Sequence, residues 1–303
     1  MGDGRLEVGR QRFATRLQSD PAIDDGVNLI DAAPVTARLK TGVFKMIDRR
    51  TVSTALIAGV AASLLGGSST AQVRPAVSAR NVVLVHGAYA DGSCWSEVIR
   101  RLQLFGLNAT AVQNPLTSLA DDVAATQRIL ALQEGPTVLV GHSWAGTVIS
   151  EAGVDPKVSA LVYVAARAPD AGEDYTALAT RFPMPPASAG LVKSGGFAQL
   201  SEDAFLGDFA GDIEPAKARI LYAVQGPISD TLFSGKTTNA AWQSKPSWYA
   251  ISTEDRTISP ELERFMANRM KAKTIEVKAS HLSLISHPQE ITDLILDAAG
   301  HNG

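Results

Sequence analysis

The chain has 303 residues, of which 45% are hydrophobic and 19% are charged, so it can form a sizeable core and is not a disordered or fibrous protein. Its formal net charge of -3 lacks the basic excess that nucleic-acid binding requires. The single cysteine, Cys94, excludes an internal disulfide and a cysteine-rich metal site, and no apolar run reaches the roughly 18–20 residues that span a bilayer.

A leader-like pattern begins at Met46. The basic pair Arg49 and Arg50 precedes about a dozen small and apolar residues, and a small-x-small pattern then ends at Ala71. This order is typical of a secretory signal peptide that is cleaved after Ala71. The paired arginines favour the twin-arginine route, but the residues after them fit that route poorly, so general secretion stays open. A short N-terminal helix is the alternative interpretation.

Three segments follow from this pattern. Residues 46–71 are predicted to be the signal peptide and residues 72–303 the mature domain. A signal peptide has to begin its chain, so residues 1–45 are expected to be a non-native or disordered extension, or the product of a misassigned start. The leader predicts a periplasmic or secreted location.

Short apolar runs alternate with helical patterns along the mature chain. The runs predict strands at 81–87, 107–112, 137–141, 158–164, 247–253 and 274–278. The helical patterns cover 96–104, 118–133, 143–153, 260–270 and 288–299. Strands that are apolar on both faces and alternate with helices predict an α/β fold, with a mostly parallel central sheet and helices on both faces.

The alternation stops at residues 167–246, which are rich in Pro and Gly and contain isolated aromatic residues. An insertion of this kind in a regular α/β chain predicts a cap. The cap would cover the carboxyl edge of the sheet, where open α/β sheets bind their ligands.

The segment Gly141-His142-Ser143-Trp144-Ala145-Gly146 lies between a predicted strand and a predicted helix. A serine at such a junction sits on a tight turn that exposes its hydroxyl above the sheet, beside a helix N-terminus. The usual pattern is G-x-S-x-G, and Ala145 departs from it mildly because alanine is still small. Ser143 is therefore the candidate nucleophile, and a serine that only caps the helix is the alternative.

A serine nucleophile needs a base, and His281 is the favoured one of the five histidines. It directly follows the last predicted strand, so its loop leaves the same edge of the sheet as Ser143. A purely structural role is the alternative.

The base in turn needs an acid to orient it. Glu254 and Asp255 both leave the carboxyl end of the strand predicted at 247–253. Asp170 and Glu173, which follow the strand predicted at 158–164, are the rival candidates. With Asp255 the chain order is serine, acid, histidine, which is the order of α/β-hydrolases.

A negatively charged carbonyl oxygen would need two preorganised hydrogen-bond donors. The backbone N–H of Trp144, directly after the serine, is one candidate. The other is the N–H of Ala88, because Gly87 allows the loop after the first strand to turn sharply towards the site.

Four stretches of the chain resemble the α/β-hydrolase fold family: 83–95, 141–146, 253–262 and 280–281. They look like its small-esterase branch, which includes plant methyl esterases, hydroxynitrile lyases and many bacterial carboxylesterases. The resemblance covers roughly residues 80–299. It implies a catalytic triad of Ser143, His281 and Asp255, because the second acid of the matching loop is the triad member. It also implies an oxyanion hole from Ala88 and Trp144.

The resulting expectation is a serine hydrolase that cleaves small carboxylic esters or lactones through an acyl-enzyme, with no metal and no organic cofactor. Its partner would be a small-molecule ester. Lyase members of the family carry a lysine where this chain has Leu282, so lyase activity is not expected. A small-molecule binding protein of the same fold and a cofactor-free dioxygenase are the alternatives. Acyl and alcohol preference and oligomeric state stay open.

Overall fold

A central sheet of six strands positions every candidate site residue. The computed structural model describes residues 78–301, so the extension predicted at 1–45 and the signal peptide predicted at 46–71 lie outside the described residues. The strands lie in the order β2-β1-β3-β4-β8-β9, and all their pairings are parallel. Their bounds are β1 (Asn81–Val85), β2 (Asn108–Val112), β3 (Thr137–His142), β4 (Val158–Val164), β8 (Ser247–Ser252) and β9 (Lys273–Val277).

The inner strands are made of apolar, mostly β-branched residues because helices cover both of their faces. Every residue of β1 and β3 is buried, whereas the edge strands β2 and β9 are partly exposed. The register brings the carboxyl ends of the inner strands together: Val85 is opposite Gly141, and Gly141 is opposite Tyr163. Loops that leave these ends therefore meet above one edge of the sheet.

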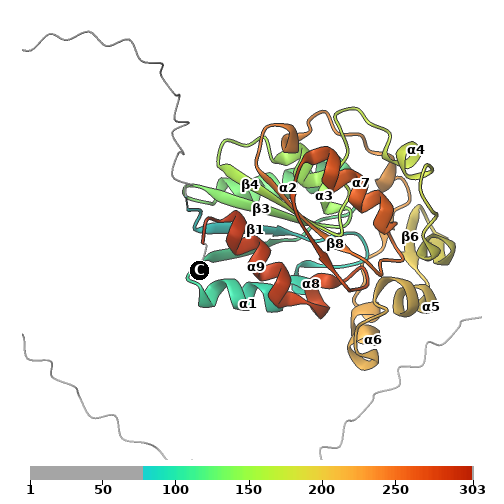
Figure 1. Ribbon diagram of the computed structural model, residues 1–303. Coiled ribbons are helices and arrows are strands. Elements are labelled where there is room, and N and C mark those ends of the chain that lie inside the picture. Colours follow the sequence, from blue (N-terminus) through green and yellow to red (C-terminus); the bar gives the residue numbers. More distant parts are fainter. Residues whose placement is uncertain (1–77, 302–303) are drawn as a thin grey trace, which may run out of the picture. The chain divides into compact units, whose positions relative to one another are not determined.

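Helices cover both faces of the sheet. Figure 1 shows α1, α8 and α9 below it and α2, α3 and α7 above it. Within these layers α1 contacts α9, and α2 contacts α3. The bounds are α1 (Ser96–Leu104), α2 (Leu119–Ala131), α3 (Ala145–Ala152), α7 (Pro260–Met270), α8 (Ser283–Ser286) and α9 (Pro288–Ala298), with a 3₁₀ turn at η1 (Gly92–Trp95). The predicted α/β architecture is confirmed.

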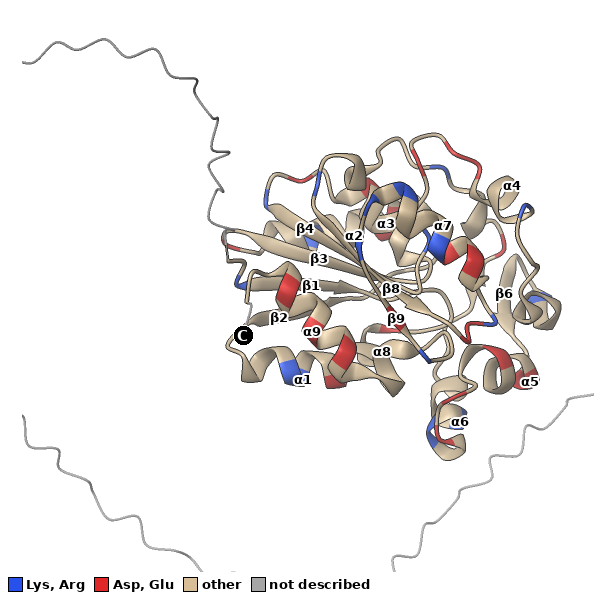
Figure 2. Ribbon diagram, in the orientation of Figure 1, with Lys and Arg blue, Asp and Glu red and all other residues tan. Residues whose placement is uncertain are grey.

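Charged residues are nearly absent from the strands of the central sheet. Of the six strands only β9 carries any, Lys273 and Glu276, and the remaining charges lie on helices and loops (Figure 2). Among the described residues, no helix is both long enough and apolar enough to cross a membrane.

Between β4 and β8 the chain leaves the sheet and builds a separate layer at its carboxyl edge (Figure 1). This excursion, residues 165–246, contains an antiparallel sheet in the order β5-β6-β7. Its elements are α4 (Tyr175–Ala179), η2 (Pro186–Gly190), β5 (Leu191–Ser194), β6 (Phe197–Leu200), α5 (Glu202–Ala204), η3 (Phe205–Phe209), α6 (Pro215–Ala223), β7 (Ile228–Ser229), η4 (Leu232–Ser234) and η5 (Ala241–Gln243). These short strands were not expected from the sequence.

Candidate active site

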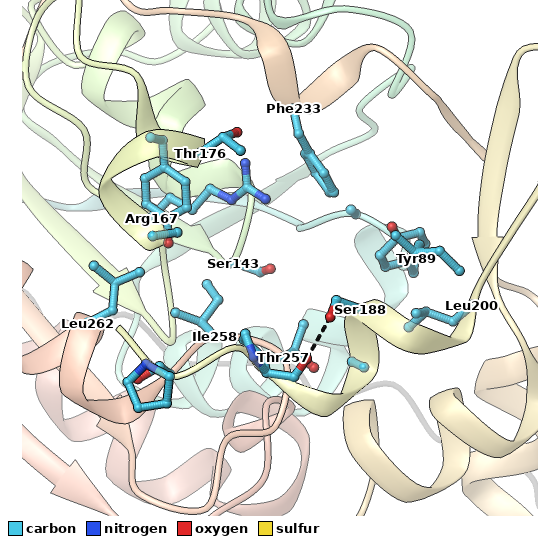
Figure 3. Close-up of a pocket in the computed structure, with 18 residues that line it drawn as sticks. Tyr89, Ser143, Arg167, Thr176, Ser188, Leu200, Phe233, Thr257, Ile258 and Leu262 are labelled. Carbon is cyan, nitrogen blue, oxygen red and sulfur yellow. Dashed lines mark hydrogen bonds between the residues drawn. The ribbon is translucent and has the colours of Figure 1, made fainter. Parts of the chain in front are cut away.

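Ser143 occupies the turn between β3 and α3 in a strained conformation. Its φ of 54° lies in the left-handed region, which non-glycine residues rarely adopt. The turn is fixed by two backbone hydrogen bonds: Ser143 N–H donates to the carbonyl of Val164 at 3.1 Å, and Gly146 N–H donates to the carbonyl of Ser143 at 3.1 Å. Ser143 is only 7% exposed, and its side chain faces a cavity (Figure 3).

Glycines allow the backbone to pack closely around this turn. A Cβ on Gly146 would lie 1.8 Å from the carbonyl oxygen of Arg167, and one on Gly87 would lie 2.7 Å from Cβ of Ser143. A Cβ on Gly141 would lie 2.8 Å from the carbonyl oxygen of Ala145. Glycine is therefore needed at 141 and 146, whereas position 145 accommodates a methyl group, which explains the departure from the usual pattern.

His281 and Asp255 form a buried pair at the same edge of the sheet. Asp255 follows β8 and His281 follows β9, and His281 Nδ1 lies 2.5 Å from Asp255 Oδ2, with both side chains fully buried. The other carboxylate oxygen of Asp255 accepts from the N–H groups of Thr257, at 2.6 Å, and Ile258, at 2.9 Å. His281 Nε2 is buried and has no hydrogen-bond partner within residues 78–301. It is therefore free to accept a proton.

The other candidate acids have different partners. Glu254 lies on the surface, 3.6 Å from Lys278. Glu173 pairs with Arg269 at 2.7 Å, and Asp170 accepts from the side chain of Gln243 at 2.6 Å. Of the four acids considered from the sequence, the structure brings only Asp255 to His281 among the described residues.

His142 packs directly against His281, a contact that the sequence pattern did not indicate. The two ring centroids are 4.8 Å apart, and His142 Nε2 lies 3.0 Å from the carbonyl oxygen of His281. Burial, followed by the nearby His281 ring, holds the pKa of His142 well below its usual value, so the ring is neutral. A neutral His142 donates from Nε2 and fixes the backbone of the His281 loop.

The loop after β1 is held by His86. Its Nε2 accepts from the N–H of Asn114 at 2.9 Å, which leaves Nδ1–H to donate to the carbonyl of Gly87 at 2.8 Å. The next residue, Ala88, lines the cavity together with Ser143. Within residues 78–301, the N–H groups of Ala88 and Trp144 donate no hydrogen bond.

The cavity above Ser143 has a volume of about 330 Å³. The loop after β1, the excursion and the loop before α7 build its walls, which are largely apolar. Examples are Leu191, Leu200, Ile258 and Leu262. Arg167, in the loop that follows β4, is the one positively charged residue in the lining, and no sequence pattern pointed to it. In the described part of the chain, no cluster of three or more His, Cys, Asp or Glu residues could hold a metal ion.

The model of the "Alpha/beta hydrolase family" matches residues 82–294. The chain belongs to this family. The match includes residues of all six strands of the sheet and contains Ser143, Asp255 and His281, so the fold and the resemblance inferred from the four motifs are confirmed.

Individual proteins that the chain resembles share about a quarter of its residues or fewer. The chain is 27% identical over 242 residues to the alpha/beta hydrolase nvfD of Aspergillus novofumigatus, covering 72% of this chain and 96% of that protein. It is 25% identical over 247 residues to methylesterase 8 of Arabidopsis thaliana, covering 73% and 89% respectively. The crystal structure of polyneuridine aldehyde esterase superposes with a TM-score of 0.63 at 19% identity, covering 72% of this chain and 98% of that one, which shows a common fold.

Proposed function

We propose that this protein is a serine hydrolase that cleaves small carboxylic esters or lactones through an acyl-enzyme intermediate. The observation that carries the proposal is the buried His281–Asp255 pair, which leaves Nε2 of His281 without a partner within residues 78–301 at the sheet edge that also holds Ser143. A hydroxyl becomes an effective nucleophile when such an oriented base takes its proton. Relatives named as esterases support an ester as the substrate.

Each residue has a separate task in the proposed reaction. Ser143 attacks the carbonyl carbon while His281 Nε2 takes the hydroxyl proton, which His281 then delivers to the departing alcohol. Asp255 holds the imidazole in the tautomer with a proton on Nδ1 and stabilises its charged form. In the second half, His281 takes a proton from water, the resulting hydroxide attacks the acyl carbon, and Ser143 recovers its proton.

The oxygen of the attacked carbonyl becomes negatively charged in both halves of the reaction. The N–H groups of Ala88 and Trp144 are the proposed donors. Ala88 lines the cavity together with Ser143, Trp144 directly follows Ser143, and neither N–H has a partner within the described residues. Loss of one such donor typically costs about 3–4 kcal/mol of transition-state stabilisation.

The proposal is tested by turnover of p-nitrophenyl butyrate. Ser143→Ala should lower kcat by about 10³-fold or more, because the nucleophile is lost. Ser93→Ala, at an exposed serine in η1, is the matched control and should retain wild-type turnover. Wild-type turnover by Ser143→Ala would show that another residue is the nucleophile. Oxygen uptake without ester cleavage would instead support a dioxygenase.

A further inference from the structure

The cavity above Ser143 contains an arginine whose charge no acidic residue balances. Arg167 follows β4, and its guanidinium extends into the space bordered by Ser143, Thr176 and Phe233 (Figure 3). Within residues 78–301 its guanidinium nitrogens make no ion pair and no hydrogen bond, and the ionisable groups that act on its charge are Tyr175 and Tyr89. Burial lowers the pKa of Arg167 from its ordinary value because no acidic residue in the described part of the chain offsets the loss of water. The guanidinium still stays charged at neutral pH.

Aromatic rings hold the guanidinium in position without using its donors. Its central carbon lies 3.9 Å from the ring centroid of Phe233, 4.6 Å from that of Tyr175 and 5.5 Å from that of Trp144. Ring faces attract the positive charge and fix the plane of the group. They leave its N–H donors, which lie in the plane, available to a ligand in the cavity.

A comparison within the chain distinguishes this arginine from a structural one. Arg269 is also largely buried and stacks on two aromatic rings, at 5.5 Å from Trp242 and 5.3 Å from Phe265. Its guanidinium is bound by both carboxylate oxygens of Glu173 and by the carbonyl of Ala168. Glu173 thus balances the charge of Arg269, whereas Arg167 has no such acidic residue among those described.

The position of Arg167 relative to the nucleophile is fixed by the backbone. Its N–H donates to the carbonyl of Ser143 at 3.0 Å, and its own carbonyl occupies the space that a side chain on Gly146 would need. An anion bound by the guanidinium is therefore held at a constant place relative to the Ser143 hydroxyl. The surrounding walls are apolar, so they would hold the carbon chain that links this anion to the reacting carbonyl.

We propose that Arg167 forms a carboxylate subsite and that the substrates are esters which carry a free carboxylate, such as monoesters of dicarboxylic acids. A planar guanidinium with two parallel N–H groups matches a carboxylate in geometry as well as in charge. This inference rests on the proposed ester hydrolase function and defines its substrate class.

Monomethyl glutarate and dimethyl glutarate test the subsite, because they share a carbon chain and differ in charge. The wild type should have a higher kcat/KM for the monoester, and Arg167→Leu should lower the ratio of the two kcat/KM values by about 10- to 100-fold. Arg167→Lys, which keeps the charge but loses the fork, should retain part of the preference. Arg181→Leu, at an exposed arginine that is not in the cavity lining, should keep the wild-type ratio. An unchanged ratio in Arg167→Leu would overturn the subsite.

A binding experiment separates failure of the subsite from failure of the hydrolase function. Calorimetry at constant ionic strength would measure monomethyl and dimethyl glutarate binding to Ser143→Ala, with and without Arg167→Leu. Tighter binding of the monoester that disappears with Arg167→Leu supports the subsite even if neither ester is hydrolysed, in which case the hydrolase proposal alone fails. Equal binding to both proteins, or no binding of the monoester, overturns the subsite even if dimethyl glutarate is cleaved.

Discussion

Glu263 is a second carboxyl group buried behind the proposed catalytic acid. It belongs to α7 and is fully buried; one oxygen accepts from the N–H of Ser252 at 3.2 Å, and the other has no partner within the described residues. Burial, and then the nearby charge of Asp255, raises the pKa of Glu263 well above its usual value. Glu263 is therefore held neutral, so it can lie beside Asp255 without repelling its charge.

The neutral state of Glu263 makes the stability of the protein depend on pH. An unfolded glutamate ionises near pH 4.5, whereas the folded one keeps its proton to a higher pH, so the free energy of unfolding falls as pH rises above 4.5. Glu263→Gln removes this loss. The variant should gain stability relative to the wild type by up to about 1.4 kcal/mol per pH unit in that window.

Urea unfolding at pH 5, 6 and 7 measures this gain. Glu261→Gln, at an exposed position on the same helix, is the control and should show no gain that grows with pH. A stability difference between Glu263→Gln and the wild type that stays constant over these pH values would contradict the assignment of Glu263 as a buried neutral acid.

The strand–turn–helix unit of β3 and α3 depends on two close backbone contacts. Gly146 faces the carbonyl of Arg167, and Gly141 faces the carbonyl of Ala145. These contacts press α3 against the end of β3 and hold Ser143 in its left-handed conformation. The same contact at Gly146 also positions the backbone of Arg167. Ser143 and the proposed carboxylate subsite therefore both depend on this contact.

Gly146→Ala should destabilise the protein by about 1–3 kcal/mol or more, because its methyl group would overlap backbone that cannot move independently. Gly207→Ala is the matched control, since a Cβ there meets nothing within 4 Å and its φ is not positive. The free energy of unfolding in urea measures both. Equal stability of the two variants would show that the contact at Gly146 does not constrain the turn.

The elements of the sheet could be predicted from the sequence, whereas those of the excursion could not. β1, β3 and β4 are continuous apolar runs because both faces are buried, and that pattern is visible without neighbours. The strands β5, β6 and β7 have only 4, 4 and 2 residues, which is too few to show an alternation of apolar and polar side chains. One sequence signal does indicate the hairpin: Gly195 and Gly196, with φ of 59° and 82°, form the two-residue turn between β5 and β6.

At the scale of the whole molecule, the parallel topology allowed much of the candidate site to be predicted from the sequence. Loops after β3, β8 and β9 had to leave one edge of the sheet, so Ser143 and His281 could be grouped from their places in the chain. The choice of Asp255 over Glu254 comes from the resemblance of residues 253–262 to the acid loop of the family.

The role of Arg167 and the buried contact of His142 with His281 could not be predicted. Both depend on how single side chains are directed at the end of β3 and in the loops after β4 and β9, and not on a repeating pattern.

The export signal at 46–71 lies outside the described residues and stays a prediction. N-terminal sequencing of the protein from its own host should give a mature chain that begins at Gln72. A retained Met1 would contradict cleavage at that position.

The most direct test of the whole account is covalent labelling with a fluorophosphonate, followed by peptide mass spectrometry. We expect one adduct per chain, located on Ser143, formed rapidly in the wild type and much more slowly in His281→Ala. Ser143→Ala should carry no label. A label on another residue, or a wild-type protein that stays unlabelled, would contradict the assignment of Ser143 as a nucleophile activated by His281 and Asp255.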